Sequence, residues 1–207
     1  MILAVDTSLG TAVALIDADG SPRADAAAHD PLGHAEVIGA LLQQVVHDAG
    51  AGDITHVVAG MGPGPFTGLR IGIAAARTFA LGRAVPVIPV PSHVAAALTA
   101  IETDAAPGPF AIVTDARRRE VAITVFDGID DDGIPRIVAE TVLVPRADAD
   151  DHLAGIDRRD VDALSAVDLA RVGARALEAG RSLAGAEPLY LRHPDVTLPG
   201  IPKRVGS

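Results

Sequence analysis

The sequence contains no cysteine and no tryptophan, and aromatic residues make up only 2% of its 207 residues. Without cysteine, the chain can form no disulfide, no thiol-based catalytic site and no cysteine-ligated zinc site. Because large aromatic side chains are so scarce, the core has to be built from Ala, Val, Leu and Ile. With 49% hydrophobic and 21% charged residues, the composition is that of a folded globular protein.

Positive charge is also scarce, since 17 Lys and Arg face 27 Asp and Glu and the net charge is −10. Nucleic-acid affinity depends on basic side chains that neutralise phosphates, so this charge argues against independent binding to RNA or DNA. No apolar run reaches the roughly 18 residues of a membrane span. The first residues lack the basic segment and cleavage site of a signal peptide. The sequence therefore predicts a cytoplasmic protein with no membrane role.

The apolar pattern alternates between strand-like and helix-like periods, which predicts an α/β fold. In the first half we expect strands at 2–5, 11–16, 23–29, 54–59 and 86–90 and helices at 34–49, 67–83 and 92–101. In the second half we expect strands at 110–114, 120–126 and 137–144, a short strand or extended piece at 187–191, a helix at 166–179, and short helix and loop at 148–163. A Pro- and Gly-rich segment at 105–109 predicts a hinge between a lobe of residues 1–104 and a smaller lobe of residues 105–207.

One glycine-rich stretch, Ala59 to Gly72, links a predicted strand to a predicted helix. Its spacing fits neither a Walker A loop, which needs Gly-Lys-Ser/Thr, nor the G-x-G-x-x-G dinucleotide fingerprint. Two interpretations stay open at this point. The stretch is either a structural turn with Thr67 as the helix N-cap, or a loop that faces a ligand or a partner.

Polar residues that could carry chemistry follow the first strand. Asp6, Thr7 and Ser8 stand at its carboxyl end, where α/β sheets bind ligands, and a D-T-S turn can offer hydroxyls and a carboxylate to phosphate and its cation. The alternative is that Asp6 and Ser8 only cap the turn of a hairpin.

Other polar clusters indicate less. The seven histidines include no i, i+4 pair, so no metal site can be assembled from spacing, and no Ser-His-Asp set can be nominated. The acidic turn with Asp127, Asp130, Asp131 and Asp132 lacks the EF-hand spacing and is expected to be solvated. The run from Arg117 to Arg119 either grips an acidic partner or is a solvated shoulder of a hairpin.

Two first-half helices have unusual surfaces. The apolar face of helix 34–49 is wider than the roughly 100° that a surface helix needs, so part of it is expected to meet a second layer or a partner. In helix 67–83, Gly68, Gly72 and Ala76 recur every four residues and are expected to leave a smooth strip along which another helix can approach.

Several segments together resemble the TsaB (YeaZ) family nearly end to end. They are Met1-Ile-Leu-Ala-Val-Asp-Thr-Ser8, Gly62-Pro-Gly-Pro-Phe-Thr-Gly-Leu-Arg-Ile-Gly72, Ala80-Leu-Gly82, Asp115-Ala-Arg-Arg118 with Glu120-Val121, and Pro188-Leu-Tyr-Leu-Arg192. The resemblance implies a two-lobed actin/sugar kinase/Hsp70-like (ribonuclease H-like) fold with a reduced second lobe. The chain departs from the family pattern at Pro65, Arg119 and Ala122, where Ser, Gly and Tyr are usual.

The resemblance also implies a function and partners. TsaB proteins are partners of the catalytic paralogue TsaD, with the ATPase TsaE, in making threonylcarbamoyladenosine on tRNAs that read ANN codons. We therefore expect a scaffold or activator that forms a heterodimer with TsaD, a homodimer when alone, and contacts tRNA only through the complex. The rival interpretations are a small nucleotide-binding phosphotransferase and a glycoprotease-like metallopeptidase.

Residue roles follow from the same resemblance. TsaD proteins carry an H-x-x-x-H metal pair whose positions correspond to Ser92 and Ala96, so the chain is expected to be a non-catalytic pseudoenzyme that holds no metal. No cofactor is required, and weak ATP or ADP binding is expected at most, at Asp6, Thr7 and Ser8. The expected partner interface consists of Val37, Ile38, Leu41, Leu42, Val45, Gly68, Arg70, Gly72, Ala76 and Phe79.

Overall fold

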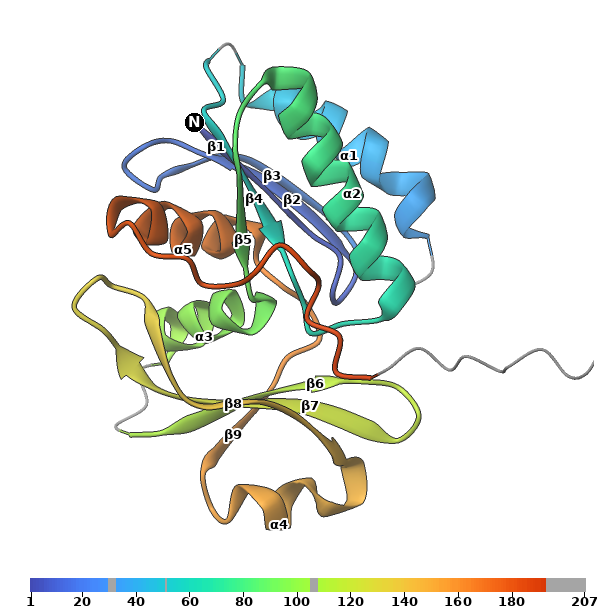
Figure 1. The fold of residues 1–207 in the computed structure, drawn as a ribbon, viewed down its shortest axis with the longest axis vertical. Coiled ribbons are helices and arrows are strands. Elements are labelled where there is room, and N and C mark those ends of the chain that lie inside the picture. Colours follow the sequence, from blue (N-terminus) through green and yellow to red (C-terminus); the bar gives the residue numbers. More distant parts are fainter. Residues whose placement is uncertain (30–32, 51, 105–107, 193–207) are drawn as a thin grey trace, which may run out of the picture.

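A computed structural model of the chain describes residues 1–29, 33–50, 52–104 and 108–192. Its secondary structure alternates between strands and helices, and the strands form two separate sheets (Figure 1). None of the helices in these residues is long and apolar enough to cross a membrane. Parts of the predicted hinge at 105–109 and the tail after residue 192 lie outside the described residues.

The first sheet contains five strands in the order β3-β2-β1-β4-β5. β1 pairs antiparallel with β2 and parallel with β4. Figure 1 shows two helices, α1 and α2, side by side on one face of this sheet, with α5 on the other face. The strands and these helices span β1 (Ile2–Asp6), β2 (Thr11–Ile16), β3 (Pro22–Ala28), α1 (His34–Asp48), β4 (His56–Gly60), α2 (Phe66–Arg83), β5 (Val87–Val90) and α5 (Ala166–Glu178).

The alternation of apolar residues in β1 explains why both faces of the first sheet are covered. Leu3 and Val5 belong to the core beneath α1 and α2, while Ile2 and Ala4 belong to the core shared with α5. Successive side chains of a strand point to opposite faces, so a strand that is apolar at every position needs a layer on each side.

The second sheet has four strands in the order β8-β7-β6-β9. Phe110 and Phe126 on its inner face share a core with α3 and α5, so these two helices form a layer between the sheets. Short α4 packs against the outer face. The two-lobed α/β architecture is confirmed. The remaining elements are α3 (Ser92–Thr103), β6 (Phe110–Asp115), β7 (Glu120–Ile129), β8 (Pro135–Pro145), α4 (Ala149–Leu153) and β9 (Asp157–Asp160).

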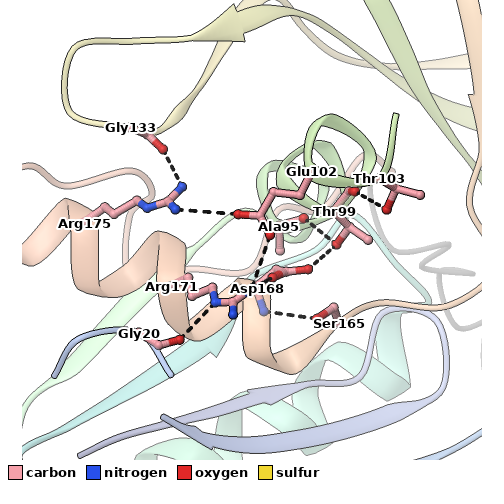
Figure 2. Close-up of polar contacts among 10 residues, drawn as sticks. All are labelled: Gly20, Ala95, Thr99, Glu102, Thr103, Gly133, Ser165, Asp168, Arg171 and Arg175. Atoms are coloured by element: carbon pink, nitrogen blue, oxygen red, sulfur yellow. Dashed lines mark hydrogen bonds and ion pairs between the residues drawn. The ribbon is translucent and has the colours of Figure 1, made fainter. Parts of the chain in front are cut away.

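A polar network on α5 and α3 ties turns of both sheets to the middle layer (Figure 2). Arg171 donates to the Gly20 carbonyl over 3.0 Å and to Asp168 Oδ1 over 2.9 Å. Asp168, which is nearly buried, also accepts from Thr99 Oγ1 over 2.6 Å. Arg175 donates to the carbonyl of Gly133, in the turn before β8, over 2.7 Å. The predicted division into residues 1–104 and 105–207 stays a prediction, and α5 of the second range packs against β1 and β2 of the first.

Two local predictions are wrong. Residues 157–160 form a strand, because Asp-Arg-Arg-Asp pairs in parallel with β6 despite having no apolar alternation. Of the two alternatives predicted for residues 187–191, the strand does not form. Helix α2 begins at Phe66, with Pro65 as its N-cap and no side-chain capping bond, so Thr67 is not the cap.

Candidate functional site

The turn after β1 is buried and tied to the start of α3. Ser92, the first residue of α3, donates from Oγ to Asp6 Oδ2 over 2.5 Å, and the Ser8 N–H donates to Asp6 Oδ1 over 2.6 Å. Burial raises the pKa of the Asp6 carboxyl, while the hydrogen bonds from Ser92 and Ser8 act in the opposite direction. The Gly62 N–H donates to Ser92 Oγ over 3.0 Å. The turn, the glycine-rich stretch and α3 therefore form one buried network.

Glycines of the 59–72 stretch stand where a larger residue would collide with this turn. A Cβ at Gly60 would lie 1.8 Å from Asp6 Oδ2, and a Cβ at Gly72 would lie 2.1 Å from Thr7 Oγ1. Thr7 Oγ1 also donates to the Gly68 carbonyl over 2.7 Å. The absence of side chains lets the loop and the first turns of α2 pack directly on the turn after β1.

This packing shows how the chain itself uses residues of both motifs. Asp6, Thr7 and Ser8 are each at most 2% exposed, and their side chains bond within the chain. In the structure these side chains bond to the chain itself, and weak nucleotide binding at them stays a prediction. The glycine-rich stretch likewise serves the chain's own packing at this point.

A cavity of about 430 Å³ opens beside the glycine-rich loop, between the first sheet and the second. We call it the motif cavity, because it is lined by residues of three segments that carry the family resemblance. Its size lies within the range of small-molecule sites. Its lining residues are Pro63, Gly64, Pro65, Phe66, Thr114, Asp115, Ala116, Arg117, Arg118, Ala122, Leu143, Tyr190, Leu191 and Arg192.

Two of the chain's five aromatic residues meet at the motif cavity. The rings of Phe66 and Tyr190 lie 4.8 Å apart between centroids, with an interplanar angle of 31°. The guanidinium of Arg70 lies 3.9 Å from the Phe66 centroid and its Nε donates to Tyr190 Oη over 2.9 Å. Phe66 is 39% exposed, so an apolar aromatic surface faces solvent here.

The turn between β6 and β7 forms a strained wall of the same cavity. Arg117, Arg118 and Arg119 all have left-handed backbone angles, with φ of 64°, 54° and 63°. Such a conformation costs a non-glycine residue about 1–2 kcal/mol. The strain is held by bonds from distant segments, since the Arg146 N–H donates to the Arg119 carbonyl over 2.8 Å and Arg192 Nη2 donates to the Arg117 carbonyl over 3.3 Å.

Carboxylates near this turn are already paired. Asp115 accepts from Arg146 Nη2 over 2.6 Å and from the Arg117 N–H over 3.1 Å, and Glu120 pairs with Arg192. In contrast, the guanidinium groups of Arg117 and Arg119 have no hydrogen-bond or ion-pair partner among the described residues. The turn therefore presents positive charge beside the cavity.

The acidic turn before β8 is closed by an arginine. Arg181 donates to Asp130 over 2.5 Å and to Asp132 over 2.6 Å. Asp130 Oδ1 also accepts from the Ile134 N–H over 2.9 Å, which shapes the turn. Across residues 1–29, 33–50, 52–104 and 108–192, no three His, Asp or Glu side chains gather closely enough to hold a metal ion.

His93 joins α3 to the second sheet from inside the protein. It is 1% exposed, and its Nδ1 and Nε2 lie 2.7 Å and 2.9 Å from the hydroxyls of Thr124 and Thr114. Burial lowers the pKa of the imidazole to about 3, so the ring is neutral at pH 7. Ser92 and Ala96, at the positions that the resemblance assigns to a metal pair, are buried too.

The residues predicted for a partner interface divide into two groups. Val37, Leu41, Leu42 and Phe79 are half-buried and Arg70 is exposed, so these can reach a partner. The other predicted residues are buried in the chain's own core, and the expected smooth strip faces Thr7 and His34 rather than outward. This orientation is a correction for Ile38, Val45, Gly68, Gly72 and Ala76.

The hydrogen bonds of Ser92 and His93 were not predicted from the sequence. Their position did hold a clue, because both residues follow β5 directly, at the edge of the sheet where polar groups gather after parallel strands. Their partners come from β1, β6 and β7, which no local pattern connects to them.

Comparisons with known proteins give a consistent family. The model of the family described as "TsaD: tRNA N6-adenosine threonylcarbamoyltransferase" matches residues 31–145, more than half of the chain. A protein of Mycobacterium tuberculosis described as uncharacterized is 38% identical over 153 residues, which are 69% of this chain and 66% of that protein. The match therefore spans just under two thirds of the mycobacterial relative.

Further relatives carry the TsaB and YeaZ names. The tRNA threonylcarbamoyladenosine biosynthesis protein TsaB of Haemophilus influenzae is 34% identical over 90 residues, 42% of this chain and 38% of that protein. A Pseudomonas aeruginosa structure described as similar to peptidase YEAZ has a TM-score of 0.75 at 25% identity and covers 92% of this chain and 99% of its own. The fold is accordingly the two-lobed actin-like one, and the chain belongs to the TsaD family, on its TsaB (YeaZ) branch.

Proposed function

We propose that the chain is a non-catalytic scaffold or activator in tRNA threonylcarbamoyladenosine biosynthesis, bound to a TsaD protein as a heterodimer. In the same proposal TsaE joins the complex, tRNA is its substrate, and the chain pairs with itself when TsaD is absent. The observation that carries the proposal is the groove between α1 and α2, with half-buried apolar side chains along it, in a chain of this family.

A shallow groove lies between α1 and α2. It is bordered by half-buried Leu42, Val46 and Phe79 together with polar side chains of α1, and nothing in the described chain covers it. Soluble monomers rarely expose large contiguous apolar patches, and such patches mark interaction sites. A partner burying roughly 800 Å² of this chain would form an interface of ordinary size.

The environment of α3 supports a non-catalytic role. The positions that correspond to the TsaD metal pair carry Ser92, which is bonded to Asp6, and Ala96, which is 3% exposed in the core. Neither a serine hydroxyl in a buried hydrogen bond nor an alanine methyl is a metal ligand of the kind that imidazole supplies.

The test is association with TsaD, measured by surface plasmon resonance with the full chain. Leu42→Glu places a charge among the half-buried side chains that border the groove, so the dissociation constant should rise at least about tenfold. Leu177→Glu on α5, where Leu177 is 43% exposed, is the matched control and should leave affinity unchanged.

Reconstitution completes the test. TsaD and TsaE with tRNA, ATP and threonylcarbamoyl-adenylate should form modified tRNA efficiently only when this chain is added, and poorly with Leu42→Glu. Equal product without the chain would contradict the proposal. Turnover of ATP by the isolated chain, measured by calorimetry, would instead favour a phosphotransferase.

A further inference from the structure

We propose that the motif cavity binds an unpaired nucleotide of RNA, with its base against Phe66 and Tyr190 and its phosphates on the arginines of the 117–119 turn. The inference rests on the proposed function in one respect, because a complex that modifies tRNA brings RNA close to this chain. It adds a direct contact between this chain and the RNA.

The first step is the uneven distribution of charge. The chain carries 17 basic residues and a net charge of −10, yet arginines concentrate around this cavity. Arg117, Arg118 and Arg192 line it, Arg70 bonds to Tyr190, and Arg146 bonds to Asp115. An acidic surface repels RNA, so a local cluster of arginines selects the place where a phosphate can approach.

The second step is the state of these arginines. Asp115 and Glu120 are the carboxylates paired within the cluster, and they satisfy Arg146 and Arg192. The guanidinium groups of Arg117 and Arg119 have no such partner in the described part of the chain. Residues with strained left-handed backbone angles are frequent at ligand-binding sites. Here three such residues in succession form the turn, and hydrogen bonds from two distant segments hold it in place.

The third step is the aromatic wall. Phe66 and Tyr190 form a tilted pair at the cavity, and Phe66 keeps 39% of its surface exposed. Arginines that hold phosphates beside aromatic rings that stack on bases are the usual combination of single-stranded nucleic-acid sites. Pro63, Pro65 and Leu143 complete an apolar lining that suits a flat heterocycle.

These features favour an unpaired nucleotide over the other candidates. A base within a duplex is stacked and paired, so it cannot enter a cavity without being flipped out. Loops of RNA display such bases without that cost. An acidic protein could bind the arginines, but it would leave the aromatic lining of the cavity unexplained. A free mononucleotide has the same base and phosphate as an RNA nucleotide, so the experiment below distinguishes the two ligands.

The experiment measures fluorescence anisotropy of a labelled RNA hairpin with a seven-nucleotide loop, titrated with the full chain at low salt. We expect weak, saturable binding, at least about tenfold weaker binding of a blunt duplex with the same stem, and no competition by adenosine monophosphate at equal concentration. Equal binding of hairpin and duplex, or competition by the mononucleotide, would overturn the proposal. Binding only of a polyglutamate peptide would assign the cluster to an acidic partner and overturn it too.

Two variants locate the contact. Arg119→Gly removes a cation and relieves a strained backbone, so the protein should become more stable while hairpin affinity falls and the salt dependence flattens by about one phosphate contact. Phe66→Leu should lower affinity at least about fivefold through lost stacking. Arg136→Ser, at the opposite end of the β7–β8 pair, is the matched control and should bind like wild type. Wild-type affinity in both Arg119→Gly, in the turn beside the cavity, and Phe66→Leu, in its lining, would overturn the proposal.

The test is independent of the proposed scaffold role. Arg119→Gly should keep its association with TsaD, because the turn lies outside the α1–α2 face. Loss of TsaD binding in Leu42→Glu with unchanged hairpin binding would support both proposals separately. If wild type fails to bind TsaD but binds the hairpin at the cavity, only the scaffold role is refuted.

Discussion

Gly72 gives the sharpest test of how the glycine-rich stretch works. In Gly72→Ala, the new Cβ would lie 2.1 Å from Thr7 Oγ1 and 2.9 Å from Thr7 Cγ2. Thr7 cannot move away freely, because its Oγ1 donates to the Gly68 carbonyl over 2.7 Å in a buried site. Overpacking costs about 1–3 kcal/mol, and loss of that hydrogen bond costs about 1–3 kcal/mol more. Alanine returns only about 1 kcal/mol of helix propensity.

The expected net result is a free energy of unfolding lowered by about 1–5 kcal/mol, measured by urea denaturation followed by circular dichroism. Gly39→Ala in α1 is the matched control, since no atom lies within 4 Å of its added Cβ. There, propensity alone should raise stability by about 1 kcal/mol. The double variant with Thr7→Ala should lose less than the sum of the single losses. If Gly72→Ala were as stable as Gly39→Ala, the close contact with Thr7 would be refuted.

Two further predictions concern buried polar groups. Burial lowers the pKa of His93 to about 3, against about 6.5 in the unfolded chain. Between these two values the unfolded state binds one more proton than the folded state, so the free energy of unfolding falls as the pH drops from 6.5 towards 3, by up to about 1.4 kcal/mol per pH unit. In His93→Gln this pH dependence should be absent from urea unfolding measured at several pH values. The raised pKa of Asp6 acts in the opposite direction, but it is present in both proteins and cancels in the comparison. Identical pH slopes in the two proteins would contradict the assignment. Arg171→Met should lower the free energy of unfolding by about 1.5–3 kcal/mol, because nearly buried Asp168 loses a charged hydrogen-bond donor. Arg136→Met breaks an exposed ion pair with Asp127 and should change the free energy of unfolding by less than about 1 kcal/mol. Similar losses in both variants would show that the burial of Asp168 does not matter.

Much of the fold follows from local pattern. Strand β1 is apolar at every position before Asp6, which predicts coverage on both faces, and the periodicities of α1, α2 and α5 place these helices within a residue or two of their bounds. Strand β9 was not predictable in this way. Asp157 to Asp160 are polar throughout, and their extended conformation comes from pairing with β6.

The candidate site divides along the same line. The motifs at 62–72, 115–118 and 188–192 are visible as sequence signatures, but their meeting at one cavity requires the chain to bring three distant segments together. The burial of Asp6 could not be predicted from the sequence either. A D-T-S turn at the end of a strand has the same sequence whether Ser92 or a ligand bonds to its aspartate. Helical spacing also placed Gly68, Gly72 and Ala76 on one face without saying which way that face points.

The amino-acid sequence by itself determined the α/β class, the family signature, the aliphatic core and the acidic net charge, because each of these depends on composition or on spacing within a single element. Only the tertiary structure decided the orientation of those elements. It turned the glycine face of α2 inward, buried the turn after β1, and set strained arginines beside two aromatic rings. The physical reason is that burial and charge environment are sums over neighbours distant in sequence, and local periodicity contains no information about which neighbours those are.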